Sequence, residues 1–119
     1  MLKRSLRLTD TKEFQNIYRR GRFHSTALLS VNVLPNRGIT KVGVVASKKV
    51  NKRATERNLL KRQVREIVRL MYPTLKPGFS IIISIRPGSV GKKYEQFERD
   101  IRAAFMKLGV FSGNTQENS

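Results

Sequence analysis

Residues 48–69 read KKVNKRATERNLLKRQVREIVR, a stretch that combines many cations with a regular apolar pattern. From Thr55 to Tyr72 the chain contains neither Gly nor Pro. Large apolar residues recur there every three or four positions, as a helix that packs on a core requires: Leu60, Val64, Ile67 and Met71. At about 100° per residue, most of the cations fall on the other side of this helix. The stretch predicts a helix with one face in the core and one cationic face.

The cationic face carries no acidic residue and is formed by Asn58, Lys61, Arg62, Arg65 and Arg69. A helix face that is merely exposed to solvent usually carries both basic and acidic residues, spaced four positions apart. Cations without acidic neighbours repel one another, a cost that a bound polyanion removes, and the planar fork of Arg matches phosphate oxygens. This face favours a nucleic acid as the partner over an ordinary solvated surface.

The composition of the whole chain agrees with a polyanionic partner. Lys and Arg number 25 against eight Asp and Glu, which gives a formal net charge of +17 and a pI of about 11.4. A membrane surface is the competing polyanion, but no run approaches the 18 apolar residues of a membrane span. The N-terminal MLKRSLRL lacks the apolar centre of a signal peptide, and there is no Cys. We expect a cytoplasmic protein with no membrane partner.

Upstream of the basic helix, the pattern predicts one further helix and two strands. Leu8–Tyr18 reads as a helix that Asp10 can cap and that Gly21 can end in the left-handed conformation. Ala27–Leu34 alternates apolar and polar residues, and Lys41–Ser47 is rich in Val. Turn-forming residues between these two strands predict a hairpin, in which the Val-rich strand is central.

Downstream, one strand and one helix complete the domain. Phe79–Ile85 is a β-branched run between breakers, and residues 94–108 form an amphipathic helix ending near Gly109. With room for a short extra strand at Arg22–His24, the fold class is α+β, with a mixed sheet packed by helices in the order α-β-β-(β)-α-β-α. A strand, helix, strand connection from Val42 to Ile85 suggests parallel strands, for which a right-handed crossover is the default. We expect one domain over residues 1–111 and a polar, disordered tail over 112–119.

Several of these segments together resemble the bacterial ribonuclease P protein subunit over roughly residues 3–109. Its signature is matched by Arg57-Asn58-x-x-Lys61-Arg62-x-x-Arg65, preceded by Ser47-Lys48-Lys49-Val50. Leu8, Phe14 and Tyr18, which precede Gly21, match the first helix of that family. Its central strand is matched by Val42-Gly43-x-x-x-Ser47, and its last strand is matched by residues 81–86. Tyr18 stands where many members of the family have Phe.

The resemblance implies a function that composition alone does not reveal. In that family, one protein binds a large catalytic RNA, the ribonuclease P RNA, and the complex removes the 5′ leader from precursor tRNA. The RNA carries the hydrolysis and binds most of the Mg²⁺ that the holoenzyme needs, so no metal is expected on the protein. The family also has a left-handed crossover around the motif helix, which replaces the right-handed default.

The resemblance also implies two RNA-contacting surfaces. The RNA subunit would be bound by Lys48, Lys49, Lys52, Arg53, Arg57, Asn58, Lys61, Arg62 and Arg65. The precursor leader would be held in a cleft between the first helix and the sheet by Phe14, Tyr18 and Arg86. Alternatives stay open at this point, because Asn58 could serve local capping, and Phe14 and Tyr18 could be core residues.

No catalytic centre is visible in the protein itself. The only His, His24, reads as an ordinary strand or loop residue, and the acids show no ligand spacing. The main alternative function is that of a noncatalytic ribosomal or RNA-chaperone protein, which would be equally small and basic. A helix-turn-helix DNA-binding domain fits less well, because strands flank the basic helix.

Overall fold

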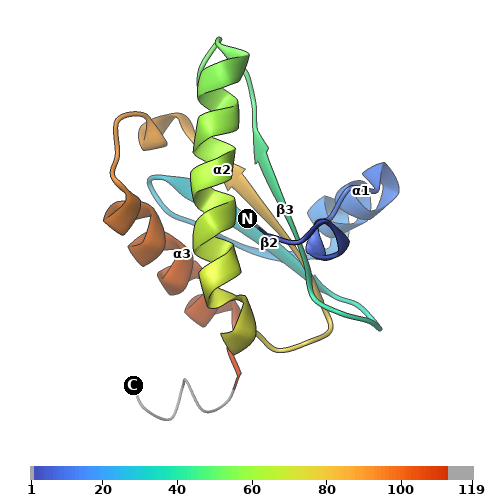
Figure 1. Cartoon of the computed structure of the whole chain (residues 1–119). Coiled ribbons are helices and arrows are strands. Elements are labelled where there is room, and N and C mark those ends of the chain that lie inside the picture. The colour runs from blue at the N-terminus through green and yellow to red at the C-terminus, as the bar shows by residue number, and fades with distance from the viewer. Residues whose placement is uncertain (1, 113–119) are drawn as a thin grey trace.

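The computed structural model describes residues 2–112, which form one four-stranded sheet with helices on both of its faces (Figure 1). The strands are β1 (Arg22–Ser25), β2 (Leu29–Pro35), β3 (Lys41–Ala46) and β4 (Phe79–Ile85). The helices are α1 (Thr11–Arg20), α2 (Ala54–Met71) and α3 (Tyr94–Leu108). Three short 3₁₀ turns are η1 (Arg4–Leu6), η2 (Tyr72–Thr74) and η3 (Pro87–Ser89). The predicted α+β class and the extra first strand are confirmed.

The strand order β1-β2-β4-β3 corrects the expected hairpin. β4 lies between β2 and β3, pairing antiparallel with β2 and parallel with β3, and β3 is an edge strand instead of the central one. β4 is buried on both faces, with Ile81 and Ile83 in the larger core and Ile82 in a smaller one. The loop after β2 is tied to the start of β4, because Asn36 donates its backbone N–H to the carbonyl of Gly78.

The connection from β3 through α2 to β4 is left-handed, as the family resemblance implies. In Figure 1 both strands point upward, α2 lies in front of the sheet, and the chain returns in β4 to the left of β3. Because β3 and β4 are parallel, their carboxyl ends meet at one end of the sheet. The loop that leads into α2 therefore starts beside the end of β4.

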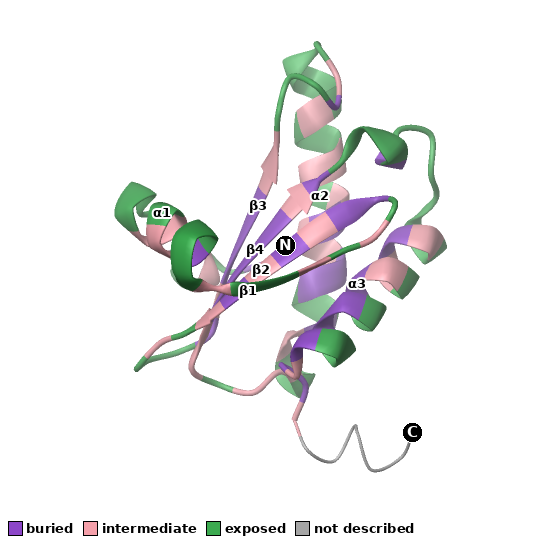
Figure 2. Ribbon diagram, turned by 180° about the vertical axis from the view of Figure 1, so that it is seen from behind, coloured by how far each residue is buried: buried purple, intermediate pink, exposed green. Residues whose placement is uncertain are grey.

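Two unequal cores hold the layers together. α2 and α3 cover one face, where the larger core includes Val64, Ile67, Phe97 and Phe105. α1 lies on the opposite face over a small cluster of buried residues, Leu8, Ile17 and Ile82. Figure 2 shows the contrast, since the strands and the inner sides of α2 and α3 are buried, whereas much of α1 is exposed. The small cluster leaves part of the second sheet face open.

The two ends of α1 are set by different means. Asp10 caps its start as predicted, with Oδ1 accepting the N–H of Lys12 at 2.8 Å. Gly21 follows its last residue, but with φ of −80° it is not left-handed, which corrects the expected C-cap. Glycine is needed there because a Cβ would lie 2.6 Å from the carbonyl oxygens of both Ile17 and Val33. The helix end is pressed against the backbone of β2.

After α3 the chain returns to the core. Phe111 is buried, forms an isolated bridge with Leu75 and packs edge-to-face on Phe105. Ser112 donates its N–H to the carbonyl of Thr74 at 2.8 Å. Apart from Ser112, the predicted disordered tail lies outside the described residues.

Thr40 joins three segments at the amino end of β4 and yields a stability prediction. Its buried Oγ1 donates to the carbonyl of Lys76 at 2.5 Å and accepts the N–H of Phe79 at 3.2 Å. Replacement by the nearly isosteric Val should lower the free energy of unfolding by about 1–3 kcal/mol, because both partners are left unpaired. Urea unfolding measures this, with Thr9→Val as the control, because Thr9 is exposed and its hydroxyl makes no hydrogen bond within residues 2–112. Equal midpoints for the two variants would contradict the prediction.

Candidate nucleic-acid interface

The loop of residues 47–53 carries the first cations of the motif and is braced by the helix that follows. Arg57 donates through Nη1 to the carbonyls of Asn51 at 2.8 Å and Lys52 at 3.0 Å. Val50 is buried in the larger core and anchors the loop from below. Around these fixed points, the loop side chains that the sequence predicted to bind RNA are exposed: Lys48, Lys49, Lys52 and Arg53. Arg57 therefore has a structural role in addition to any contact with RNA.

Further along α2, the motif residues share one outward side of the helix. Asn58 and Arg62 are exposed, and Lys61 and Arg65 are half-buried. The N-cap of α2 is Arg53, so Asn58 does not cap the helix. Asn58 and Arg62 also line an open hollow of about 380 Å³ with other residues of the first turns of the helix. The loop cations and these residues form one continuous segment of chain, which we call the motif surface.

Arg7 lies beside the motif surface and was not identified from the sequence. It pairs with Val42 in a parallel bridge along the open edge of β3, and its Nε donates to the carbonyl of Leu2 at 3.0 Å. Burial, and then the nearby charge of Arg7, lower the pKa of Arg65. Two guanidinium groups are thus held near each other, an arrangement that a phosphate group would stabilise.

Arg69, in contrast, is already engaged. Its Nε and Nη2 donate to the carboxylate of Glu66 at distances of 2.6–3.0 Å. These hydrogen bonds are the largest cause of the lowered pKa of Glu66, which falls to about 2. The helical periodicity placed Arg69 on the cationic face, but Glu66, three residues earlier, neutralises the charge of Arg69.

On the other face of the sheet, the two predicted leader-binding rings differ in burial. Phe14 is half-buried and lies over β3, where a Cβ on Gly43 would be 2.6 Å from its Cζ. Tyr18 is 49% exposed, and its hydroxyl shares a hydrogen bond with Ser84 Oγ of β4 at 3.3 Å. Phe14 therefore serves partly as a core residue, whereas Tyr18 presents a ring to solvent.

Arg86 follows the carboxyl end of β4, two residues after the Ser84 that Tyr18 contacts. Its Nη1 donates to the carbonyl of Thr26 at 3.0 Å, which ties the strand end to the turn before β2. Because Ala46 is in register with Ile85, Arg86 is next to the start of the motif loop. It remains exposed. The structure thus places it where the two predicted surfaces meet.

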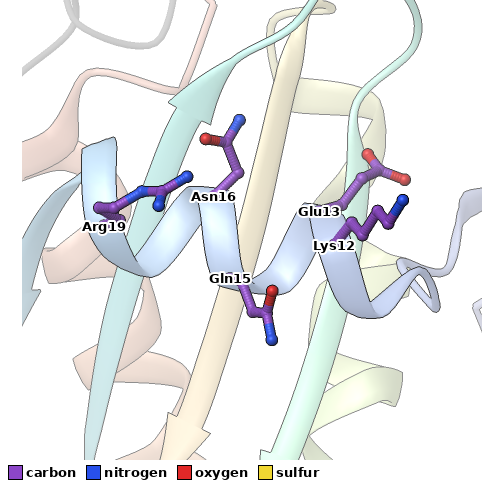
Figure 3. A pocket seen from close by; sticks show the side chains of 5 residues that line it. All are labelled: Lys12, Glu13, Gln15, Asn16 and Arg19. Atoms are coloured by element: carbon purple, nitrogen blue, oxygen red, sulfur yellow. The ribbon is translucent and has the colours of Figure 1, made fainter.

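The outer side of α1 is polar and open. Figure 3 shows the side chains that line a hollow of about 480 Å³ spread along this helix, without converging on one point: Lys12, Glu13, Gln15, Asn16 and Arg19. A convergent set of groups is expected at a small-molecule site. This hollow is better described as a hydrogen-bonding helix surface.

Charge is distributed unevenly around the sheet. Residues 14–55 and 67–94, which include all four strands, contain no Asp or Glu. In α3 three acids and three bases balance, and Glu98 pairs with Arg102 at 3.8 Å. Within residues 2–112, no group of three or more His, Cys, Asp or Glu side chains could hold a metal ion. No helix in that part of the chain is long and apolar enough to cross a membrane.

Comparisons with known proteins identify the family. The family model described as Ribonuclease P matches residues 2–109. The ribonuclease P protein component of Synechocystis is 35% identical over 119 residues, covering 98% of this chain and 96% of the relative. The corresponding protein of Roseiflexus castenholzii is 30% identical, with 98% and 96% coverage.

Solved structures show the same fold. The RNase P protein of Staphylococcus aureus superposes with a TM-score of 0.81 at 23% identity, over 90% of this chain and 98% of that one. The protein of Thermotoga maritima gives a TM-score of 0.72 at 25% identity, over 82% and 92%. The motif on α2, the strand order and these matches lead to one conclusion: the chain belongs to the ribonuclease P protein family.

Proposed function

We propose that this chain is the protein subunit of a ribonuclease P holoenzyme and binds the RNA subunit through the motif surface. The observation that carries the proposal is the outward face of Asn58, Lys61, Arg62 and Arg65, which adjoins a braced loop of exposed cations. Arginine forks and an amide at these positions can bind phosphate and ribose of a folded RNA. One copy of the protein would bind each RNA.

The substrate in this proposal is precursor tRNA, whose 5′ leader lies on the sheet face beside α1. Tyr18 and Phe14 would contact unpaired bases there, and Arg86 would meet a leader phosphate. Exposed rings stack on any base, which suits a leader of variable sequence. Mature tRNA lacks these contacts, so the protein would favour the precursor.

The chemistry is assigned to the RNA. The protein surfaces proposed to face RNA are lined by cations, which repel Mg²⁺ but reduce the repulsion between RNA strands. The ions for hydrolysis would therefore be bound mainly by RNA, at a lower concentration of Mg²⁺ when the protein is present. The cytoplasm is the proposed location of this complex.

Reconstitution tests this function directly. The purified chain, mixed with a bacterial ribonuclease P RNA at low Mg²⁺, should accelerate removal of the leader from precursor tRNA. A ribosomal protein of similar size and charge is the control, and it should not stimulate cleavage. No stimulation by this chain would contradict the proposed function, and cleavage by the protein alone would contradict the assignment of chemistry to RNA.

Tyr18→Ala should weaken binding of precursor tRNA to the holoenzyme by roughly tenfold, because a base–ring contact contributes about 1–3 kcal/mol. Binding of mature tRNA should not change. Tyr18→Phe is the matched control, since it keeps the ring and removes only the hydroxyl that contacts Ser84. Equilibrium binding of both RNAs measures the effect, and an equal loss for the two would argue against leader contact.

A further inference from the structure

Phe23 is an exposed aromatic residue that the proposed contacts do not explain. At 67%, it is the most exposed of the large apolar side chains in residues 2–112. It lies in the middle of β1, in register with Asn32 of β2. A single exposed apolar side chain is common on protein surfaces, so a role for Phe23 depends on the groups that lie around it.

The register shows which face of the sheet Phe23 occupies. Its neighbour Arg22 points to the α3 side, where Nη2 donates to the carbonyl of Leu108 at 2.6 Å. Successive side chains of a strand alternate between faces, so Phe23 points to the α1 side. Phe23 is thus on the same face as Phe14 and Tyr18.

The three rings follow one direction across the sheet. Phe14 lies over β3, Tyr18 contacts β4, and Phe23 belongs to β1 at the far edge. Neighbouring strands are about 4.8 Å apart, so β1 lies about 10 Å beyond β4. The ring of Phe23 therefore extends the aromatic contacts well past Tyr18.

A row of hydroxyl groups runs in the same direction. Ser25 Oγ of β1 donates to Ser30 Oγ of β2 at 3.1 Å, and Ser30 is in register with Ser84 of β4. Ser84 in turn shares a hydrogen bond with the Tyr18 hydroxyl. Hydroxyls both donate and accept, so this row can bind the phosphates and ribose hydroxyls of a single strand.

Electrostatics select the occupant of this face. The strands contain no acid, and exposed Arg19 and Arg20 end α1, one residue before β1. Aromatic rings interleaved with cations and hydroxyls are the features of a single-stranded nucleic-acid path. A second copy of this chain, equally basic, would be repelled.

We infer that the leader crosses the sheet from α1 towards the β1 edge, where Phe23 stacks on a base upstream of the one at Tyr18 and the Ser25–Ser30 pair binds the backbone between them. This inference rests on the proposed function, because it extends the same leader path. It assigns to Phe23 a role in binding long leaders that Phe14 and Tyr18 do not supply.

The test uses the reconstituted holoenzyme and precursor tRNAs whose leaders are lengthened one nucleotide at a time. For the unaltered protein, affinity should rise a first time when the leader reaches Tyr18 and a second time when it reaches β1. Phe23→Ala should remove this second rise, a loss of roughly tenfold for long leaders only. Phe23→Tyr should retain it, and Ile39→Ala, which truncates another half-exposed apolar side chain, should behave as the unaltered protein.

Abasic nucleotides locate the stacked base. An abasic nucleotide at one upstream leader position should weaken binding to the unaltered protein but have no further effect on Phe23→Ala. A Phe23→Ala holoenzyme that shows both rises overturns the inference and leaves the proposed function intact. Affinity that is independent of the leader at every length contradicts the proposed function itself. If light scattering shows a dimer that Phe23→Ala dissociates, Phe23 serves self-association and the inference is wrong.

Discussion

Replacing Lys61, Arg62 and Arg65 together with Gln should weaken assembly of the holoenzyme by roughly a thousandfold or more at moderate salt, since hydrogen bonds to charged groups contribute about 1.5–3 kcal/mol each. The slope of log affinity against log salt should fall by about three units if each side chain neutralises one phosphate. Filter binding of the variant to ribonuclease P RNA across a salt series measures both quantities. Arg57 is left in place because it braces the loop of residues 47–53.

The matched control replaces Arg99, Arg102 and Lys107 with Gln. It removes the same number of positive charges from α3, where acids and bases balance. All three are exposed on α3, and the net charge falls by the same amount. This control should change the affinity only slightly. If both triple variants lose the same affinity, total charge rather than the motif surface determines binding.

Gly21→Ala should lower the free energy of unfolding by roughly 3 kcal/mol, at the upper end of the usual cost of overpacking. Both atoms that a Cβ would meet at 2.6 Å are backbone carbonyl oxygens, so neither can move aside by changing a rotamer. Relief requires residue 21 to move away from both the last turn of α1 and β2, which shifts the end of the helix. Such a shift would also displace Tyr18 and β1, so precursor binding should weaken together with stability.

Urea unfolding of Gly21→Ala is best compared with Gly38→Ala. A Cβ added at Gly38 would meet no atom within 4 Å, and the φ of this residue is not positive, so Ala there should be neutral or slightly stabilising. If the two variants unfold at the same midpoint, the junction between α1 and β2 is looser than its geometry indicates.

Element positions were largely predictable because they depend on local patterns. The apolar periodicity and glycine-free run of α2 and the apolar run of β4 define those elements, and Gly109, with φ of 72°, ends α3 as expected. Strand order was not predictable from these patterns. A Val-rich run indicates burial on two sides, but β3 achieves it at an edge, under α2 on one face and beneath Phe14 on the other.

Site residues could be predicted from the sequence where the only requirement is that the side chain is exposed at the surface. The exposed motif cations are placed as the sequence suggested, and their role in binding RNA stays a prediction. The pairing of Arg69 with Glu66 could have been found from their three-residue spacing. The brace formed by Arg57, the approach of Arg7 to Arg65 and the exposure of Phe23 depend on tertiary neighbours, for which the sequence carries no local signal.

The position of β4 between β2 and β3 has a consequence for biosynthesis. Until β4 has left the ribosome, β3 has no strand partner in the sheet, and β2 can pair only with β1. A nascent chain that ends before residue 79 therefore lacks the centre of its sheet while already displaying every cation of the motif. Ribosome-stalled chains of increasing length should gain protease resistance in one late step, after residues 79–85 emerge.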